Sequence, residues 1–183
     1  MARHERTKHL LANTLMDMAK DTPIQKIQVK DICSACRVER TTFYYHFHDK
    51  YELIAWIFSQ FYEQEAARAD SPNSKAMITR MLQHLENHRD FFLNALEDPS
   101  QNNLRQYMLD FYIEYERKAV CRYLMITELD EKTDYILRHY SFGCMGNTID
   151  WLLGKTHYTP ERLAQYQYQA MPDVLKLAWS QRC

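Results

Sequence analysis

The segment from Arg40 to Phe47 has two different faces if it forms a helix. Phe43 and Phe47 lie four residues apart, so they share one face and can anchor the helix in a core. The other positions carry hydroxyl, cationic or imidazole side chains, namely Arg40, Thr41, Thr42, Tyr44, Tyr45 and His46. Such a face suits phosphate oxygens and base edges. Taken alone, the segment is better explained as a short surface helix with two core anchors.

The neighbouring residues change that interpretation. Apolar residues on one side of residues 29–36 predict a second short helix, and a three-residue break, 37–39, separates it from the first. Asp49 and Glu52 form a capping-box pattern, which predicts that a long helix begins at Lys50. Two short helices joined by three residues, the second with a polar face, are typical of a helix-turn-helix.

The rest of the chain also predicts helices. Only three glycines and five prolines occur among 183 residues, and apolar residues recur with helical spacing, so we expect an all-α protein. The sequence predicts about nine helices, at residues 5–20, 29–36, 40–47, 50–68, 74–87, 89–96, 102–126, 131–153 and 161–179. Thr159 and Pro160 form a start signal for the last helix, which Pro172 should kink or split.

Charge and composition exclude several classes of protein. Residues 1–50 hold nine Lys or Arg and six acids, whereas the remainder holds 14 and 18, so a basic head precedes an acidic body. This distribution favours an anionic partner for the head. No apolar run reaches the length of a membrane span, and no signal peptide is recognisable. The five cysteines lack a disulfide spacing, which favours free thiols and a cytoplasmic location.

Residues 27–53 resemble the DNA-binding domain of the TetR family of transcriptional regulators. The most specific part is Thr42-Phe-Tyr-Tyr-His-Phe-x-x-Lys50-x-x-Leu53. The resemblance implies a three-helix helix-turn-helix domain at residues 1–48 and a helical effector-binding and dimerisation domain at residues 49–183. It further implies a homodimer that binds double-stranded DNA at a palindromic operator and responds to a small-molecule effector of unknown identity. Repression is the commoner mode in the family.

The resemblance also assigns roles to later segments. The last two long helices, at about 131–153 and 161–180, are expected to form a four-helix dimer interface. Phe142-Gly143, Asp150-Trp151-Leu152 and Thr159-Pro160-Glu161 resemble the branch that includes regulators of dihydroxyacetone-kinase operons. A ligand cavity is implied among the central helices, and its candidate lining residues are Phe92, Tyr107, Phe111, Tyr115 and Phe142.

The candidate DNA contacts come from three helices. They are Gln28, Lys30, Arg40, Thr41, Thr42, Tyr44, Tyr45, His46 and Lys50. Lys50 is expected to hold a phosphate, because its charge adds to the free N–H groups at the start of its helix. Lys30 and Gln28, at the start of the second helix, are expected to reach the opposite strand.

Two positions just ahead of residues 40–47 depart from the family pattern. Arg37 stands where the family usually has Gly, and Glu39 stands where it usually has Ser or Thr. An arginine in a left-handed turn is strained, and a glutamate is a poor N-cap that faces an anionic partner. These departures motivate an alternative function, in which a dimeric adaptor or coactivator of the same fold acts through protein–protein contacts with little DNA binding.

No pattern in the chain indicates an enzyme, a metal centre or a cofactor. We find no Ser/His/Asp order, phosphate loop or pair of carboxylates. Cys33 and Cys36 form a CxxC pair, and His84 and His88 lie four apart, but two ligands are too few for a typical metal site. Packing explains the first pair better, and a solvated pair explains the second.

Overall fold

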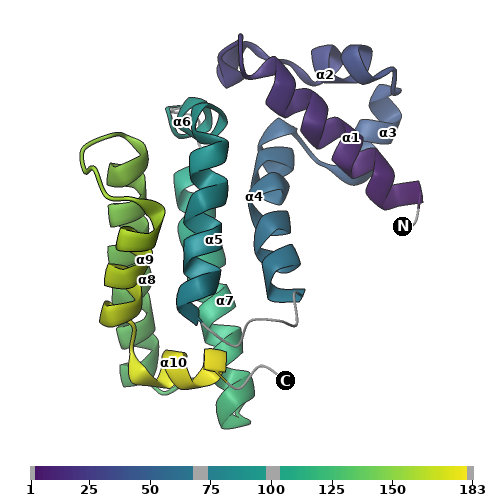
Figure 1. Ribbon diagram of the computed structural model, residues 1–183. Helices are drawn as coiled ribbons and strands as arrows, with labels where there is room; N and C mark the ends of the chain where they lie inside the picture. The colour runs from purple at the N-terminus through teal and green to yellow at the C-terminus, as the bar shows by residue number, and fades with distance from the viewer. Residues whose placement is uncertain (1–2, 68–73, 98–103, 181–183) are drawn as a thin grey trace. The chain divides into compact units, whose positions relative to one another are not determined.

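A computed structural model of the protein describes residues 3–67, 74–97 and 104–180. Within these ranges it contains ten α-helices, one short 3-10 turn and no strand, which confirms the all-α prediction (Figure 1). The elements are α1 (Arg3–Met18), η1 (Ile24–Lys26), α2 (Val29–Cys36), α3 (Arg40–His46), α4 (Lys50–Ala67), α5 (Ser74–Asn87), α6 (Arg89–Leu96), α7 (Leu104–Leu124), α8 (Glu131–Leu152), α9 (Pro160–Ala170) and α10 (Asp173–Ser180). None of these helices has the length and apolar character needed to cross a membrane.

Local start and stop signals explain several of these boundaries. The Asp49 carboxylate accepts hydrogen bonds from the amides of Tyr51 and Glu52, so α4 begins at Lys50 as predicted. Thr159 caps α9 by accepting from the amide of Arg162, and Pro160 occupies the first helical position. The predicted last helix is divided at Pro172, where α9 has ended at Ala170 and α10 begins at Asp173.

The contacts divide the chain into two compact units. One contains Met1–Gln60 and Arg89–Arg105, and the other contains Phe61–His88 and Gln106–Cys183. Helix α4 is therefore split between the two units, and α6 belongs with the N-terminal helices. The predicted domain boundary between residues 48 and 49 falls inside the first unit and stays a prediction.

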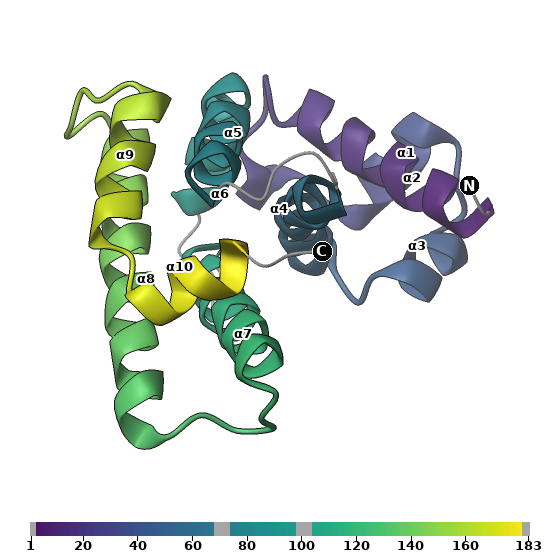
Figure 2. The ribbon, with the colours of Figure 1, turned by 60° about the horizontal axis from the view of Figure 1, so that its bottom comes forward.

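The first unit is built on helices α1 to α3, which pack around a small core (Figures 1 and 2). Its fully buried side chains include Leu11, Leu15, Ile32, Phe43 and Leu53. Asn94 of α6 is tied into the same unit. Its side chain accepts from the amide of Ile24 at 2.9 Å and donates to the carbonyls of Ala19 at 3.0 Å and Thr22 at 3.1 Å. These three bonds fasten α6 to the turn between α1 and α2.

In the second unit, α8 and α9 run side by side, and α10 crosses near their ends (Figure 2). Gln167 of α9 donates to the hydroxyl of Thr148 at 2.9 Å, and the hydroxyl of Tyr140 donates to the carbonyl of Gln167 at 3.1 Å. Helix α5 packs closely on α9, and helix α7 is joined to α8 by an ion pair between Arg117 and Asp134. The unit is therefore a helical bundle with polar bonds between its layers.

Candidate nucleic-acid interface

Helix α3 is held by its two phenylalanines, as the sequence predicts. Phe43 is fully buried and Phe47 is 3% exposed, and their rings are 5.9 Å apart. The opposite face is open: Tyr44 is 57% exposed and Tyr45 is 70% exposed, while Arg40 and Thr41 are also exposed. The two adjacent tyrosines, with Arg40 and Thr41, give this face aromatic rings and hydrogen-bonding groups. This face is the candidate nucleic-acid interface.

The turn before α3 places Arg37 in the left-handed conformation, in which an arginine is expected to be strained. Arg37 has φ 56° and ψ 44°. Its amide donates to the carbonyl of Ser34 at 3.4 Å, and the amide of Val38 donates to the carbonyl of Cys33 at 2.9 Å. These bonds form a Schellman-type end to α2, which holds the non-glycine residue in this conformation. Glu39 precedes α3 without making a side-chain capping bond.

The two candidate residues of α2 lie at its start. Lys30 and Gln28 are both exposed. The backbone amide of Gln28 donates to the carboxylate of Asp31 at 2.9 Å, which fixes the first turn of the helix. The structure therefore leaves Lys30 accessible at the beginning of a helix.

Lys50 has a different environment from the one expected. Its ammonium donates to the carbonyls of Ile24 at 2.6 Å, Ile27 at 2.9 Å and Gln25 at 3.2 Å. An ammonium group has three N–H donors, and these carbonyls at the end of η1 accept all three. The geometry thus occupies the Lys50 ammonium with structural hydrogen bonds, which argues against the phosphate contact expected from its position at the start of α4.

Thr42 and His46 are half-buried and lie beside α1. Together with Thr41 and Tyr45 they line a hollow of about 440 Å³, to which α1 contributes His4 and Thr7. His4 and Thr7 are not among the contacts predicted from the sequence. The signal that could have found them is their spacing, since His4, Thr7 and Lys8 share one face of α1 ahead of its apolar stripe.

Three of the five candidate ligand-binding residues lie together on one helix. Tyr107, Phe111 and Tyr115 stack along α7, with ring centroids 6.2 Å and 5.7 Å apart. Phe142 lies on α8 and is 52% exposed, whereas Phe92 is fully buried and belongs to the other compact unit. The structure therefore groups three of the five residues. The α7 face carries an aromatic stack against which Tyr62 packs, 5.1 Å from Phe111 and 5.4 Å from Tyr115.

A buried carboxyl group lies next to this stack. Glu116 is 2% exposed and accepts from the hydroxyl of Ser141 at 2.6 Å, and no ion pair with it occurs among the described residues. Burial raises the pKa of Glu116 to about 8, although the bond from Ser141 opposes this shift. The sequence held a signal for Glu116, which follows Met108 and Tyr112 at intervals of four on the inner side of α7.

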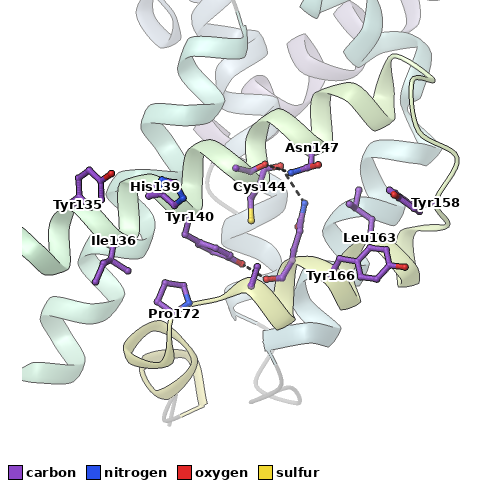
Figure 3. Close-up of a pocket in the computed structure, with 13 residues that line it drawn as sticks. Tyr135, Ile136, His139, Tyr140, Cys144, Asn147, Tyr158, Leu163, Tyr166 and Pro172 are labelled. Carbon is purple, nitrogen blue, oxygen red and sulfur yellow. Dashed lines mark hydrogen bonds between the residues drawn. The ribbon is translucent and has the colours of Figure 1, made fainter.

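Helices α8 and α9 line an open hollow of about 660 Å³ (Figure 3). Its lining includes Tyr140, Cys144, Asn147, Tyr158 and Tyr166. On the same helix α8, Tyr135 is 69% exposed and Phe142 is 52% exposed. The family resemblance places the dimer interface on these two helices, and their surface here is aromatic and exposed in the single chain.

The Cys and His pairs show no metal geometry. Cys33 is buried and Cys36 is half-buried, and both are free thiols whose pKa burial raises. The ring of His84 stacks on Phe61 at 3.7 Å, and burial lowers the pKa of His84 to about 4. Within residues 3–67, 74–97 and 104–180, no group of three or more His, Cys, Asp or Glu is placed to hold a metal ion.

Two family models match the chain. Residues 16–57 match "Bacterial regulatory proteins, tetR family", and residues 72–173 match "Transcriptional regulator C-terminal region". A curated relative, the HTH-type dhaKLM operon transcriptional activator DhaS of Lactococcus lactis subsp. lactis (strain IL1403), is 26% identical over 87 residues. That match covers 47% of this chain and 46% of the relative, so the chain aligns with about half the length of that protein.

Solved structures share the fold over most of the chain. The dihydroxyacetone kinase operon activator DhaS superposes with a TM-score of 0.63 and 18% identity, covering 89% of this chain and 92% of its own. A tetR-family transcriptional regulator from Streptomyces coelicolor gives 0.56 and 18%, covering 93% and 80%. Thermus thermophilus FadR, a repressor solved in complex with lauroyl-CoA, gives 0.54 and 15%, covering 89% and 90%.

Proposed function

Because the chain belongs to the TetR family of transcriptional regulators, we propose that it binds a palindromic DNA operator as a homodimer and that a small-molecule effector controls this binding. A regulator of this kind acts in the cytoplasm. The observation that carries the proposal is the outward face of α3. Arg40, Thr41, Tyr44 and Tyr45 are exposed on a helix whose other face is anchored by buried phenylalanines. Such a helix can enter the major groove while its anchors stay in the core.

The proposed contacts fall into two groups. Arg40, Thr41 and Tyr45 are the candidates for base edges and nearby phosphates, and Tyr44 reaches the backbone. Lys30 is the candidate for the opposite strand, because it is exposed at the start of α2. Lys50 is left out of the proposed contacts, since three carbonyls already occupy its ammonium donors.

The proposed dimer uses α8 and α9. Its support is the exposed aromatic side chains of Tyr135, Phe142 and Tyr166, of which Tyr135 and Tyr166 line the hollow between these helices. An apolar surface of this kind is the usual mark of a protein–protein contact. A two-fold dimer would place two α3 helices in successive major grooves, roughly 34–36 Å apart.

The proposed effector site lies along α7. The stacked rings of Tyr107, Phe111 and Tyr115 offer apolar surface, and Glu116 offers a polar group close by. A ligand that binds one dimer conformation better than the other would shift the population between them, and operator affinity would follow. Phe92 and Phe142 are not included in this proposed site.

Selection from random duplex DNA tests the central proposal. The purified protein is expected to enrich a palindromic sequence, and its affinity should fall steeply between 50 mM and 200 mM salt. Arg40→Ala and Tyr45→Ala should each reduce affinity for the selected operator by at least tenfold. Arg122→Ala is the matched control, because this exposed arginine lies on α7 and should have no effect.

Two other results would change the proposal. A protein that folds and dimerises but selects no DNA at either salt concentration would favour the adaptor function. The exposed Glu39 at the start of α3 is the feature that suggests this function.

The sign of regulation is measured separately, with a reporter gene behind the selected operator. We expect repression, and a signal that rises with the protein would instead assign activation, as in the name of the DhaS relative.

A further inference from the structure

A hollow between α1 and α3 collects polar side chains at the edge of the proposed DNA-binding face. It measures about 440 Å³ and is lined by His4, Thr7, Thr41, Thr42, Tyr45 and His46. None of these residues carries a carboxylate. The lining carries three threonine hydroxyls, one phenol and two imidazoles, which are groups that hydrogen-bond to oxyanions.

The two imidazoles are close enough to act on one bound group. The ring centroid of His4 lies 5.5 Å from that of His46 and 5.3 Å from that of Tyr45. The rings of Tyr45 and His46 are themselves 5.1 Å apart. Two imidazolium ions at this separation repel each other, so the empty hollow disfavours the doubly protonated state and an anion between the two rings would favour it.

The surrounding charges make His46 sensitive to such an anion. Burial lowers the pKa of His46, and the positive charges of His4 and Lys8 lower it further, while Glu5 acts in the opposite direction. Glu5 also pairs with Lys8 at 3.4 Å, so part of its charge is already matched. An anion in the hollow reverses the balance, because it stabilises the protonated form of both histidines.

From this geometry we propose that His4, Thr7 and His46 form a phosphate-binding pocket that takes up protons when a DNA backbone phosphate enters it. The inference rests on the proposed function, since the phosphate is assigned to the operator. Operator affinity then rises as pH falls through the range in which histidine titrates. By linkage, each proton taken up contributes at most about a tenfold change in affinity per pH unit.

Operator affinity is measured at pH 5.5, 6.5 and 7.5 at one salt concentration. Four forms of the full chain are compared, namely the wild type, His4→Gln, His46→Gln and His48→Gln. Glutamine keeps a neutral hydrogen-bonding side chain but cannot gain the proton. The wild type should bind more tightly at low pH. His4→Gln and His46→Gln should each lose at least half of this pH dependence.

His48→Gln is the matched control. The His48 side chain is 92% exposed and does not line the hollow, so this variant should keep the wild-type pH dependence. The imidazole resonances of His4 and His46 are followed by NMR in the free protein and with operator. Both should titrate at higher pH when operator is bound. Equal pH dependence in His4→Gln and wild type, or no response of the His4 imidazole to operator, would overturn the proposal.

A second arm distinguishes the two sources of phosphate. Inorganic phosphate is added to the free protein while the same two imidazole resonances are observed. A response to inorganic phosphate without any response to operator would overturn the assignment to DNA. If the wild type selects no DNA at any pH, the proposed DNA-binding function is refuted, and the phosphate pocket is judged separately with inorganic phosphate. The pocket is then supported if inorganic phosphate shifts both imidazole resonances in the wild type and no longer shifts that of His46 in His4→Gln. Any other response to inorganic phosphate would overturn it.

Discussion

Replacing Lys50 with methionine separates a structural role from a DNA-binding role. The ammonium lies 2.6 Å from the carbonyl oxygen of Ile24, 2.9 Å from that of Ile27 and 3.2 Å from that of Gln25. Methionine keeps most of the apolar stem but removes the charge and all three donors. A hydrogen bond to a charged group contributes about 1.5–3 kcal/mol, but water can replace the partner of the exposed Gln25 carbonyl. We therefore expect the free energy of unfolding to fall by about 2–4 kcal/mol.

The expected effect on DNA binding is different. If Lys50 makes no phosphate contact, the slope of log Kobs against log salt stays at its wild-type value, provided the measurements use temperatures at which the variant is folded. Lys30→Met is the matched control, because Lys30 is exposed at the start of α2. Lys30→Met should reduce that slope by about 0.9 and change the free energy of unfolding by no more than about 0.5 kcal/mol.

Urea unfolding and hydrogen exchange provide the assay. The amides of residues 24–27 should exchange faster in Lys50→Met, because the ammonium no longer holds the carbonyls of that turn. The structural role of Lys50 would be refuted if Lys50→Met kept the wild-type free energy of unfolding and reduced the salt slope by about one unit. That pair of results would return Lys50 to the list of phosphate contacts.

Three further substitutions test other features of the fold. Asn94→Ala leaves the buried Ile24 amide unpaired, so the free energy of unfolding measured by urea titration should fall by about 2–4 kcal/mol. The control is Asn147→Ala, which changes an exposed residue and should lower that free energy by less than about 0.5 kcal/mol. The pKa of Glu116 is raised to about 8, so the folded chain holds its proton more tightly than the unfolded chain does. The free energy of unfolding of the wild type should therefore fall by up to about 1.4 kcal/mol per pH unit as the pH rises from near 4.5 to near 8. Glu116→Gln should remove this pH dependence. Arg37→Gly should gain about 0.5–1 kcal/mol, because glycine adopts φ 56° without strain; unchanged stability would contradict this.

The helices were predictable because their signals are local. Apolar spacing placed α3 and α5, the Asp49 cap placed the start of α4, and Pro172 separated α9 from α10. Each signal acts within one or two helical turns and is therefore visible in a short stretch of sequence. The burial of Phe43 and Phe47 followed from the same periodicity.

The partners of key polar side chains were not predictable in this way. Lys50 bonds to a carbonyl 26 residues away, Glu116 to a hydroxyl 25 residues away, and Asn94 to a carbonyl 75 residues away. Only the packing of separate helices brings these groups together. Lys50 shows the consequence most clearly, because a lysine at the start of a helix has the same local sequence whether it meets a phosphate or a carbonyl.

The two departures from the family pattern have different consequences. Arg37 affects the fold, and the fold accommodates it, because the amides of Arg37 and Val38 close the end of α2 despite the positive φ. Glu39 affects the partner instead, since its side chain is exposed at the start of α3 and makes no capping bond. A carboxylate there repels phosphate but can accept from the amino group of cytosine. The helix-turn-helix therefore forms without the usual residues, and Glu39 is expected to act on which operator is chosen.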